Sequence, residues 1–419
     1  NGLLSSVAAI SSESDYRTGF GLLNGPENPS YLVDIASGYN ELAFNMKNEG
    51  KNSYSKNKAI VMSTSSHKQE LLKNLYRASF WVTFVEPGVD LDYFQDSTNN
   101  LLVIHYNDQH TSSDRYDAIT VTDKSSQYKK VIKEYIQDNA FAISDYNIDQ
   151  AIKAFNSING EWLLRVIGSK GHFAREKISI VSAMKYLESY LYHPSITWIP
   201  VSLEEILRVA AAVNLTKREG IFSTKNLKSF GKHSDDILMM GLEKQGEQLL
   251  LYLYPVEVKI GRLQTSKAHI QIEKTAQLFK EFLMDKPDEH SFRKKFYRNF
   301  FAQILLSNAK KIYSNRLWTK EKYDEIHDLK VQLLNDDFTV GEHLEGYIGK
   351  GAVLHFRNNS GFRSAELNND ILNLMFIEED AYAGLSTSIE TIIEKMDKGL
   401  TDFNPDKLLV NQYVSKNQQ

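Results

Sequence analysis

The sequence lacks cysteine, contains only eight prolines in 419 residues and has no long apolar run. Without cysteine the chain can form no disulfide bonds and no thiolate-ligated zinc site, a composition that suits a cytosolic protein. The absence of any run of about 18 apolar residues predicts that no segment spans a membrane. A Gly-x-x-x-x-Gly-Lys-Ser/Thr motif is also absent, so these residues hold no phosphate-binding loop of that type.

The composition is that of a folded protein, because 42% of the residues are hydrophobic and 11% are aromatic, enough for a sizeable core. The length suits two or three domains. No secretory signal is visible in the sequence. Because the first residue is Asn1 and not Met, we expect the chain to be a piece of a longer protein.

Charge is unevenly distributed along the chain. The formal net charge is −4, yet residues 214–320 contain 20 Lys and Arg against 11 Asp and Glu, so this segment carries about +9. A basic segment in an acidic chain predicts a surface that faces phosphate groups. For any single lysine, a solvated helix face is an equally good interpretation.

Hydrophobic periodicity predicts an α/β chain in three segments. A smaller α/β module occupies residues 1–123, with loops over 1–66, a larger α/β domain with helical additions occupies 124–383, and a C-terminal helix and tail occupy 384–419. The expected helices cover residues 35–45, 68–78, 128–136, 148–158, 161–167, 178–192, 202–213, 266–284, 292–312 and 386–396. Besides a hairpin at 235–260, the expected strands cover residues 80–85, 101–106, 116–122, 197–201, 221–227, 331–334, 352–356 and 371–377.

The predicted hairpin brings acidic residues together. Two apolar runs flank a polar turn that contains Gly246, which predicts two antiparallel strands. If the turn centres on Gly246 and Glu247, Asp236 lies opposite Glu257, with Cβ atoms about 4.5–5.5 Å apart. Glu257 and Lys259 are two residues apart and therefore share a face of the strand. An Asp, a Glu and a Lys are thus expected to converge at the rim of a buried sheet.

Two details of the hairpin remain open in the sequence. Asp235 competes with Asp236, which we prefer because apolar residues follow it directly. Pro255 lies inside the second strand, where a proline removes a ladder hydrogen bond, and a β-bulge there would shift the pairing with Glu257 by one residue. The convergence of charges is expected with either register.

Two carboxylates and a lysine at the end of a buried sheet suit the hydrolysis of phosphodiesters with a divalent metal ion. Carboxylates supply the hard oxygen ligands that Mg²⁺ prefers, and the ion lowers the pKa of a bound water. A lysine beside them can orient the water and offset negative charge. The apolar run before Glu257 indicates a central strand, which would hold the cluster rigidly.

Asp236, an apolar strand, a turn, a second apolar strand and then Glu257-Val258-Lys259 resemble the Asp…Glu-x-Lys signature of the restriction-endonuclease-like PD-(D/E)xK nuclease superfamily. The resemblance implies a mixed sheet flanked by helices and DNA cleavage that depends on Mg²⁺, with Mn²⁺ as a substitute. It also implies that Asp236 and Glu257 bind the metal together with the backbone carbonyl of Val258. Lys259 would position the attacking water.

The same resemblance implies two further site residues. Superfamily members often add an acid from the helix before the hairpin, here Glu204 or Glu205, and a polar residue from the helix after it, here Gln271. Glu205 also fits a helix cap, because it stands three residues after Ser202 at the predicted helix start. Gln271 equally fits a solvated helix position.

Four segments carry a narrower resemblance: FWVTFVEPGVDLD at 80–92, IHYNDQ at 104–109, YDAITVT at 116–122 and the helix at 200–213. They look similar to the large ATPase-containing protein of DNA phosphorothioation-dependent restriction systems, whose nuclease-bearing part this chain resembles. This implies a cytoplasmic bacterial protein that takes part in restriction, an antiviral defence against foreign DNA, and acts on double-stranded DNA. The ATPase or translocase would be a region or subunit outside these residues.

Plainer interpretations stand beside these. Glu257 and Lys259 also fit a simple ion pair at a strand end, and the basic residues of 293–298 also fit an ordinary surface. The rival sequence Asp328-Leu329-Lys330 has no preceding apolar strand and no partner acid on a hairpin. The alternative function is a catalytically inactive module of the same fold that binds DNA or docks an ATPase partner.

Overall fold

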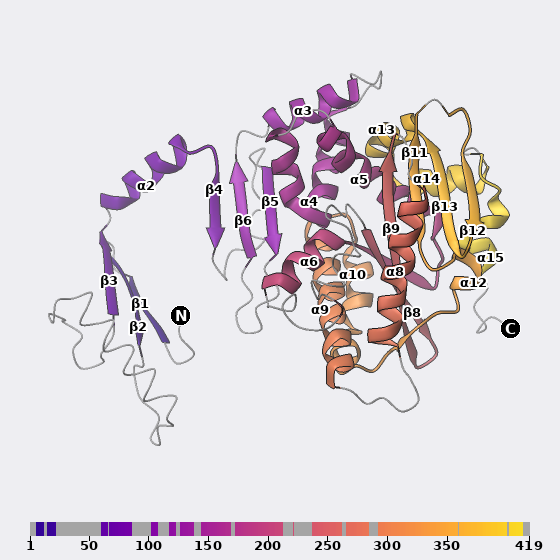
Figure 1. Ribbon diagram of the computed structural model, residues 1–419. Helices are drawn as coiled ribbons and strands as arrows, with labels where there is room; N and C mark the ends of the chain where they lie inside the picture. Colours follow the sequence, from indigo (N-terminus) through magenta and orange to yellow (C-terminus); the bar gives the residue numbers. More distant parts are fainter. Residues whose placement is uncertain are drawn as a thin grey trace. The chain divides into compact units, whose positions relative to one another are not determined.

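The computed structural model describes residues 6–11, 15–21, 60–65, 67–85, 102–107, 117–122, 126–137, 144–168, 172–212, 221, 237–261, 265–284, 292–358, 360–399 and 402–413. Contacts divide the chain into two compact units, Asn1–Val82 and Thr83–Gln419. Figure 1 shows the elements of both units. None of the described helices has the length and the apolar character that a membrane span requires.

In its described residues, the first unit contains a three-stranded antiparallel sheet followed by a helix. Strands β1 (Ser6–Ser11), β2 (Asp15–Gly21) and β3 (Ile60–Ser65) pair in that order, and α2 (His67–Ala78) follows. The expectation of loops over residues 1–66 is wrong at these three strands, because they are short and their serines and glycines obscure the alternation of apolar residues. The helix expected at 35–45 lies outside the described residues, whereas the helix expected at 68–78 is confirmed.

The three strands predicted at 80–85, 101–106 and 116–122 form a second small sheet. They are β4 (Val82–Val85), β5 (Leu102–Asn107) and β6 (Asp117–Thr122), in the order β4-β6-β5. Helix α3 (Ser126–Gln137) follows, and α4 (Asp145–Gly168) packs on β5. The α4 helix unites two expected helical pieces and departs from helical geometry between them, at Asn159 (φ −156°, ψ 98°).

The second unit is built on a mixed seven-stranded sheet. Its strands are β7 (Ile196–Ser202), β8 (Ile237–Gln245), β9 (Gln248–Ile260), β10 (Thr339–Val340), β11 (Ala352–Arg357), β12 (Ser364–Asn368) and β13 (Ile371–Ile377). The order is β12-β13-β11-β9-β8-β7, and β10 also pairs with β9. Strands β7, β8 and β9 are antiparallel neighbours, whereas β9, β11 and β13 run parallel. The predicted α/β class, with a mixed sheet flanked by helices, is confirmed.

Helices cover both faces of this sheet (Figure 1). One face packs against α6 (Leu203–Ala212), α8 (Thr265–Leu283) and α9 (Phe292–Ser314), in a core that includes Leu251, Phe279 and Phe301. The other face packs against α5 (His172–Tyr190) and α13 (Glu378–Ser386), and α14 (Ile389–Asp397) packs on α5. Because strand residues alternate between faces, odd-numbered residues of β9 lie on the α8 face and even-numbered residues on the α5 face.

One predicted strand is a helix. Residues 331–334 belong to α11 (Lys330–Leu334), which packs on α9 and buries Leu333 completely. Periodicity does not distinguish a strand from a buried helical turn in an apolar run of this length, so tertiary packing decides. The rival Asp328-Leu329-Lys330 therefore links α10 (Lys320–His327) to α11 and is not on a strand.

The other predicted elements within the described residues are present, whereas α10, α13, β10 and β12 were not predicted. The strand expected at 221–227 lies, apart from residue 221, outside the described residues. Contacts of α4 with β5 and of α14 with α5 cross residues 123 and 383, where the sequence analysis divided the chain. A short helix, α12 (Glu345–Ile348), precedes β11, and the C-terminal segment adds the short helices η4 (Pro405–Lys407) and α15 (Leu409–Gln412).

Part of the basic segment 214–320 is buried. In α9, Arg298 forms an ion pair with Asp336 and is 3% exposed. Lys311 donates to the Ile158 carbonyl at 3.1 Å, and Lys294 is also buried. These three charged side chains are buried, so the surface of this segment is less basic than its sequence suggests.

Candidate functional site

The β8–β9 hairpin has the turn that the sequence predicts. Gly246 and Glu247 form it, with Gly246 at φ +61°, a left-handed conformation that glycine adopts without strain. Pairing then runs without interruption from the turn to Ile237 with Val256. The hairpin therefore carries Glu257 at the end of its pairing, as predicted.

The predicted acid of the first strand directly precedes the described part of β8 in the sequence. Asp236 and its rival Asp235 both lie outside the described residues. The described pairing stops at Ile237 with Val256, one residue short of the predicted pair of Asp236 with Glu257, so that pair stays a prediction. Within the described ranges, no three His, Asp or Glu side chains are grouped to hold a metal ion.

Pro255 does not produce a bulge. It pairs with Leu238 in an unbroken register. Residue pairs of an antiparallel ladder are alternately hydrogen-bonded and not hydrogen-bonded. The pair next to a two-residue turn, here Gln245 with Gln248, is hydrogen-bonded. The even-numbered residues of β9 therefore form their backbone hydrogen bonds with β8. Pro255 therefore faces the other edge of β9, between Leu251, where pairing with β10 ends, and Val256, where pairing with β11 begins. At that point the strand loses little by lacking an amide hydrogen.

Glu257 and Lys259 lie on the α8 face of β9. The Glu257 side chain is 2% exposed, whereas that of Lys259 is 32% exposed, and the Lys259 ammonium donates to Glu257 Oε1. Glu257 Oε2 is buried and has no hydrogen-bond partner among the described residues. Leaving a buried acceptor unpaired costs about 1–3 kcal/mol, and more for a charged group. This arrangement keeps one carboxylate oxygen available to a donor or a cation.

The backbone carbonyl of Val258 points away from β11. Odd-numbered residues of β9 bond to the β10 and β11 side, where the Leu251 carbonyl accepts from the Gly341 amide at 3.0 Å. By the same alternation, the Val258 carbonyl is directed toward the β8 side. The described part of β8 ends at Ile237, so this carbonyl lies past the described pairing of the hairpin.

His355 stands beside Lys259 on the neighbouring strand β11, where the two residues are paired in parallel register. Paired residues of adjacent strands share a face, so His355 joins Glu257 and Lys259 under α8. Its Nε2 lies 2.7 Å from the Gly261 carbonyl oxygen, which can only accept, so Nε2 carries the hydrogen. Burial lowers the pKa of His355, and its Nδ1 is buried with no partner in the described part of the chain.

Two contacts fix the end of β9 to β11. Gly261 adopts φ +87°, and its amide donates to the Phe356 carbonyl at 3.0 Å while its carbonyl accepts from His355. The sequence analysis missed His355 because nothing near it marks it. Only the parallel pairing of β11 with β9, which the sequence did not predict, brings it to Lys259.

Helix α8 covers this part of the sheet. Ala268 and Ile272 pack against Val353, which is the β11 partner of Glu257. Gln271, the predicted polar residue of this helix, is half-buried and precedes Ile272. The structure thus places Gln271 on the helix that packs against this part of the sheet, and its role in the site stays a prediction.

Helix α6 begins at the same end of the sheet. Ser202, the last residue of β7, pairs with Ile237, and α6 starts at the next residue. Glu204 Oε2 accepts from Trp162 Nε1 at 2.8 Å and from Lys177 Nζ at 3.3 Å. The Glu204 carboxylate therefore already holds two donors. The side chain of Glu205 lies outside the described residues, so both its cap and its site role stay predictions.

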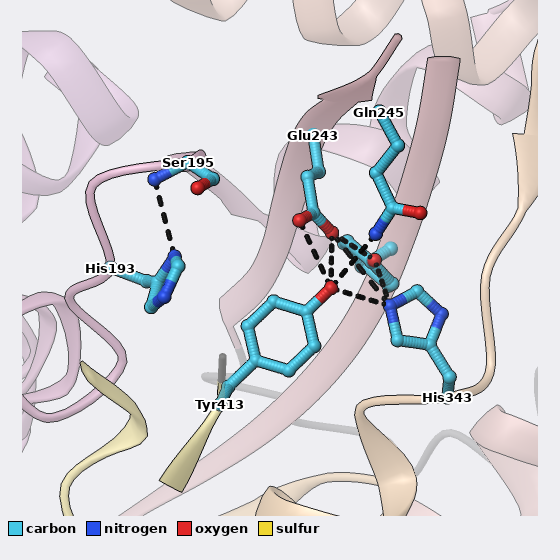
Figure 2. A network of polar contacts seen from close by, with 7 residues as sticks. His193, Ser195, Glu243, Gln245, His343 and Tyr413 are labelled. Atoms are coloured by element: carbon cyan, nitrogen blue, oxygen red, sulfur yellow. Dashed lines mark hydrogen bonds and ion pairs between the residues drawn. The ribbon is translucent and has the colours of Figure 1, made fainter. Parts of the chain in front are cut away.

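A second polar cluster lies at the turn end of the hairpin, on the α5 face (Figure 2). Glu243 is 1% exposed and accepts from the hydroxyl of Tyr252 at 2.6 Å and from that of Tyr413 at 2.9 Å. His343 Nε2 lies 2.7 Å from the Tyr252 oxygen and 2.9 Å from the Tyr413 oxygen. Gln245 Nε2 donates to the same Tyr413 oxygen at 2.9 Å.

These contacts hold the end of the chain against the hairpin. Since both tyrosine hydroxyls donate to Glu243, their oxygens accept from His343 and Gln245. Burial, then the hydrogen bond to Glu243, raises the pKa of Tyr413 to about 12, and the same causes raise the pKa of Tyr252 further. Local sequence patterns do not reveal this cluster, because Glu243 and Tyr413 are 170 residues apart.

Family models, curated proteins and solved structures contain no match to this chain. The chemistry of the site therefore has to be argued from its own residues. Glu257 is a buried carboxylate with one unpaired oxygen, Lys259 lies beside it, and the Val258 carbonyl is directed toward the β8 side. These groups suit a hard cation and an anionic substrate.

Proposed function

We propose that the chain is a Mg²⁺-dependent DNA endonuclease. The observation that carries the proposal is the Glu257–Lys259 pair, in which a buried carboxylate keeps Oε2 unpaired beside an ammonium group. An unpaired buried carboxylate oxygen is costly unless the working state brings it a partner. A divalent cation is such a partner, and the phosphodiester of DNA is a substrate that needs one.

The residues fit a hard cation. Glu257 Oε2 and the Val258 carbonyl are oxygen donors of the kind that Mg²⁺ and Mn²⁺ accept, and Asp236 is the predicted third. When bound, the ion supplies charge neutralisation and a water of lowered pKa. Lys259 is 32% exposed and can reach a phosphate oxygen or a water while its ammonium stays near Glu257. Burial under α8 keeps Glu257 in one position.

The biological setting is part of the proposal and rests on the sequence resemblance alone. The chain would act in the bacterial cytoplasm, in restriction of foreign double-stranded DNA. It would work with an ATPase or translocase region outside these residues.

The test is cleavage of supercoiled plasmid with Mg²⁺ or Mn²⁺ by the parent chain and by Asp236→Ala, Glu257→Gln and Lys259→Ala. We expect each variant to lose about 10²–10³-fold in rate, the loss typical of removing one preorganised charge-stabilising group. Lys350→Ala is the matched control, because it removes a lysine whose ion pair with Asp370 is on the surface. Equal rates for the parent and the site variants would reject the site assignment.

A second candidate is the inactive module that binds DNA or docks an ATPase. The observation in its favour is that Lys294, Arg298 and Lys311 are buried, so the basic segment is partly structural and its phosphate-facing surface is reduced. DNA binding by the parent chain without cleavage in either metal would favour this candidate over the nuclease.

A further inference from the structure

Two lone-pair atoms without partners occur on adjacent strands at the candidate site. Among the described residues, four buried side-chain atoms have no hydrogen-bond partner, and two of these are Glu257 Oε2 and His355 Nδ1. Glu257 lies on β9 and His355 on β11, two residues beyond Val353, which is the partner of Glu257. The two side chains face the same side of the sheet, because His355 pairs with Lys259. Both atoms can only accept, since the hydrogen of His355 is on Nε2.

We infer that His355 is a positioning residue that holds a water of the hydration shell of the cation bound by Glu257. The inference rests on the proposed function, because it needs a cation at Glu257. A small divalent ion such as Mg²⁺ keeps several of its waters when it binds a protein. A metal-bound water has two O–H groups that donate hydrogen bonds. One of them can donate to the lone pair on His355 Nδ1, which carries no hydrogen.

The spacing of the two side chains favours a water between them over direct metal binding by both. Glu257 and His355 are diagonal neighbours on adjacent strands, for which the separation is about 7–8 Å, somewhat less between Cβ atoms. Two metal–oxygen bonds of about 2.0–2.1 Å each, from Glu257 to the ion and from the ion to its water, and a hydrogen bond of about 2.7–2.9 Å from that water form a path of this order. The carboxylate would bind the ion and the imidazole would bind its water.

The Gly261 contact makes this role specific to one nitrogen. Because Nε2–H donates to the Gly261 carbonyl, the imidazole is held as one tautomer with its lone pair on Nδ1. A histidine that served the core alone would need only the Gly261 contact. The two nitrogens can therefore be separated by substitution, since Gln can keep a donor near the Nε2 position and Asn can keep an acceptor near the Nδ1 position.

The experiment measures cation binding without DNA. Mn²⁺ and Mg²⁺ are titrated calorimetrically into the full chain, its His355→Gln and His355→Asn variants, and Glu257→Gln, and the melting temperature of each is recorded. We expect His355→Gln to weaken cation binding about 10-fold or more while keeping the parent melting temperature, a loss typical of outer-shell partners of metal ligands. His355→Asn should keep most of the affinity and melt at a lower temperature.

His193→Asn is the control, because His193 is buried elsewhere and its Nδ1 accepts from the Ser195 amide at 3.2 Å. It should leave cation affinity unchanged. The inference is overturned if His355→Gln binds both cations like the parent while Glu257→Gln does not, and the proposed function then stands. If the parent itself binds neither cation, the proposed function fails and this inference fails with it. Losses of affinity that simply follow melting temperature in both His355 variants would assign His355 to structure alone.

Discussion

The β8–β9 hairpin carries a buried glutamate near each end, and the two carboxylates differ in their hydrogen-bond partners. At the turn end, both oxygens of Glu243 accept hydrogen bonds from tyrosine hydroxyls. At the far end, Glu257 receives the Lys259 ammonium on Oε1, and Oε2 has no partner among the described residues. The two side chains are equally buried, so exposure does not explain the difference.

The comparison separates a structural carboxylate from a candidate functional one. Hydrogen bonds to a charged group contribute about 1.5–3 kcal/mol each, so the Glu243 cluster stabilises the fold and fixes Tyr413 near the end of the described chain. At the Glu257 end one carboxylate oxygen has no hydrogen bond among the described residues, so this end gains less stability. Sites that bind ions or substrates commonly keep such unsatisfied groups, which is why this end is the one to test for activity.

The largest expected contrast comes from changing each glutamate to glutamine. Glu243→Gln should lower the free energy of unfolding by about 3 kcal/mol, because two charge-assisted hydrogen bonds weaken in a buried place. Glu257→Gln should change it by less than about 1 kcal/mol, because the lost ion pair is offset by removal of a buried charge with an unpaired oxygen. Urea denaturation followed by tryptophan fluorescence measures both. Equal losses would show that the two ends do not differ in this way.

Removing one hydroxyl from the satisfied end should have a smaller effect. Tyr413→Phe should cost about 1–2 kcal/mol, since Glu243 keeps the Tyr252 hydroxyl. Tyr382→Phe is the matched control, because its hydroxyl donates to Glu378 within the same helix, α13, away from this cluster. A cost for Tyr413→Phe no larger than that of the control would show that the cluster does not fasten the end of the chain.

The same tyrosine gives a pH dependence of known sign. The pKa of Tyr413 is raised from 10 to about 12 in the folded chain, so the folded state holds this proton more tightly than the unfolded state. Its contribution to stability is full below pH 10 and is lost as pH rises toward about 12. Tyr413→Phe should therefore flatten the fall in stability over this range, which alkaline titration at fixed urea detects.

The smallest expected effect comes from the turn that joins the two strands of the hairpin. Gly246→Ala places a side chain at φ +61° in the turn, with open space around it, and should cost about 1 kcal/mol from backbone strain alone. Cation binding at the Glu257 end should be unchanged, because the pairing up to Val256 does not depend on the turn residue. A change of register, visible as loss of cation binding with little loss of stability, would contradict this.

The sequence predicted the hairpin well because its information is local. A glycine-containing turn and two apolar runs fix which residues pair, and the structure follows that register to Ile237. The same local reasoning failed at residues 331–334, where the short apolar run is a helix because α9 offers it a packing surface. Local patterns decide an element only when they are long enough to exclude the alternative.

Features made by distant segments could not be predicted. His355 reaches Lys259 through a parallel pairing of strands that are about ninety residues apart, and parallel register has no turn to reveal it. The burial of Lys294, Arg298 and Lys311 likewise depends on the packing around α9, so the basic charge count overstated the surface charge. The pairing of Asp236 with Glu257 stays a prediction of the hairpin register.

Pro255 has one more consequence for the sheet. On the edge of β9 opposite to β8, a short stretch pairs with β10 and a longer stretch pairs with β11. Pro255, which has no amide hydrogen, lies between these two stretches. On this edge no pairing joins the part of β9 beside Glu243 to the part that carries Glu257, so we expect the two parts to open to solvent separately although both pair with β8. In native-state amide hydrogen exchange they should appear as two cooperative units with separate opening energies, so a loosened C-terminal end would leave the Glu257 half protected.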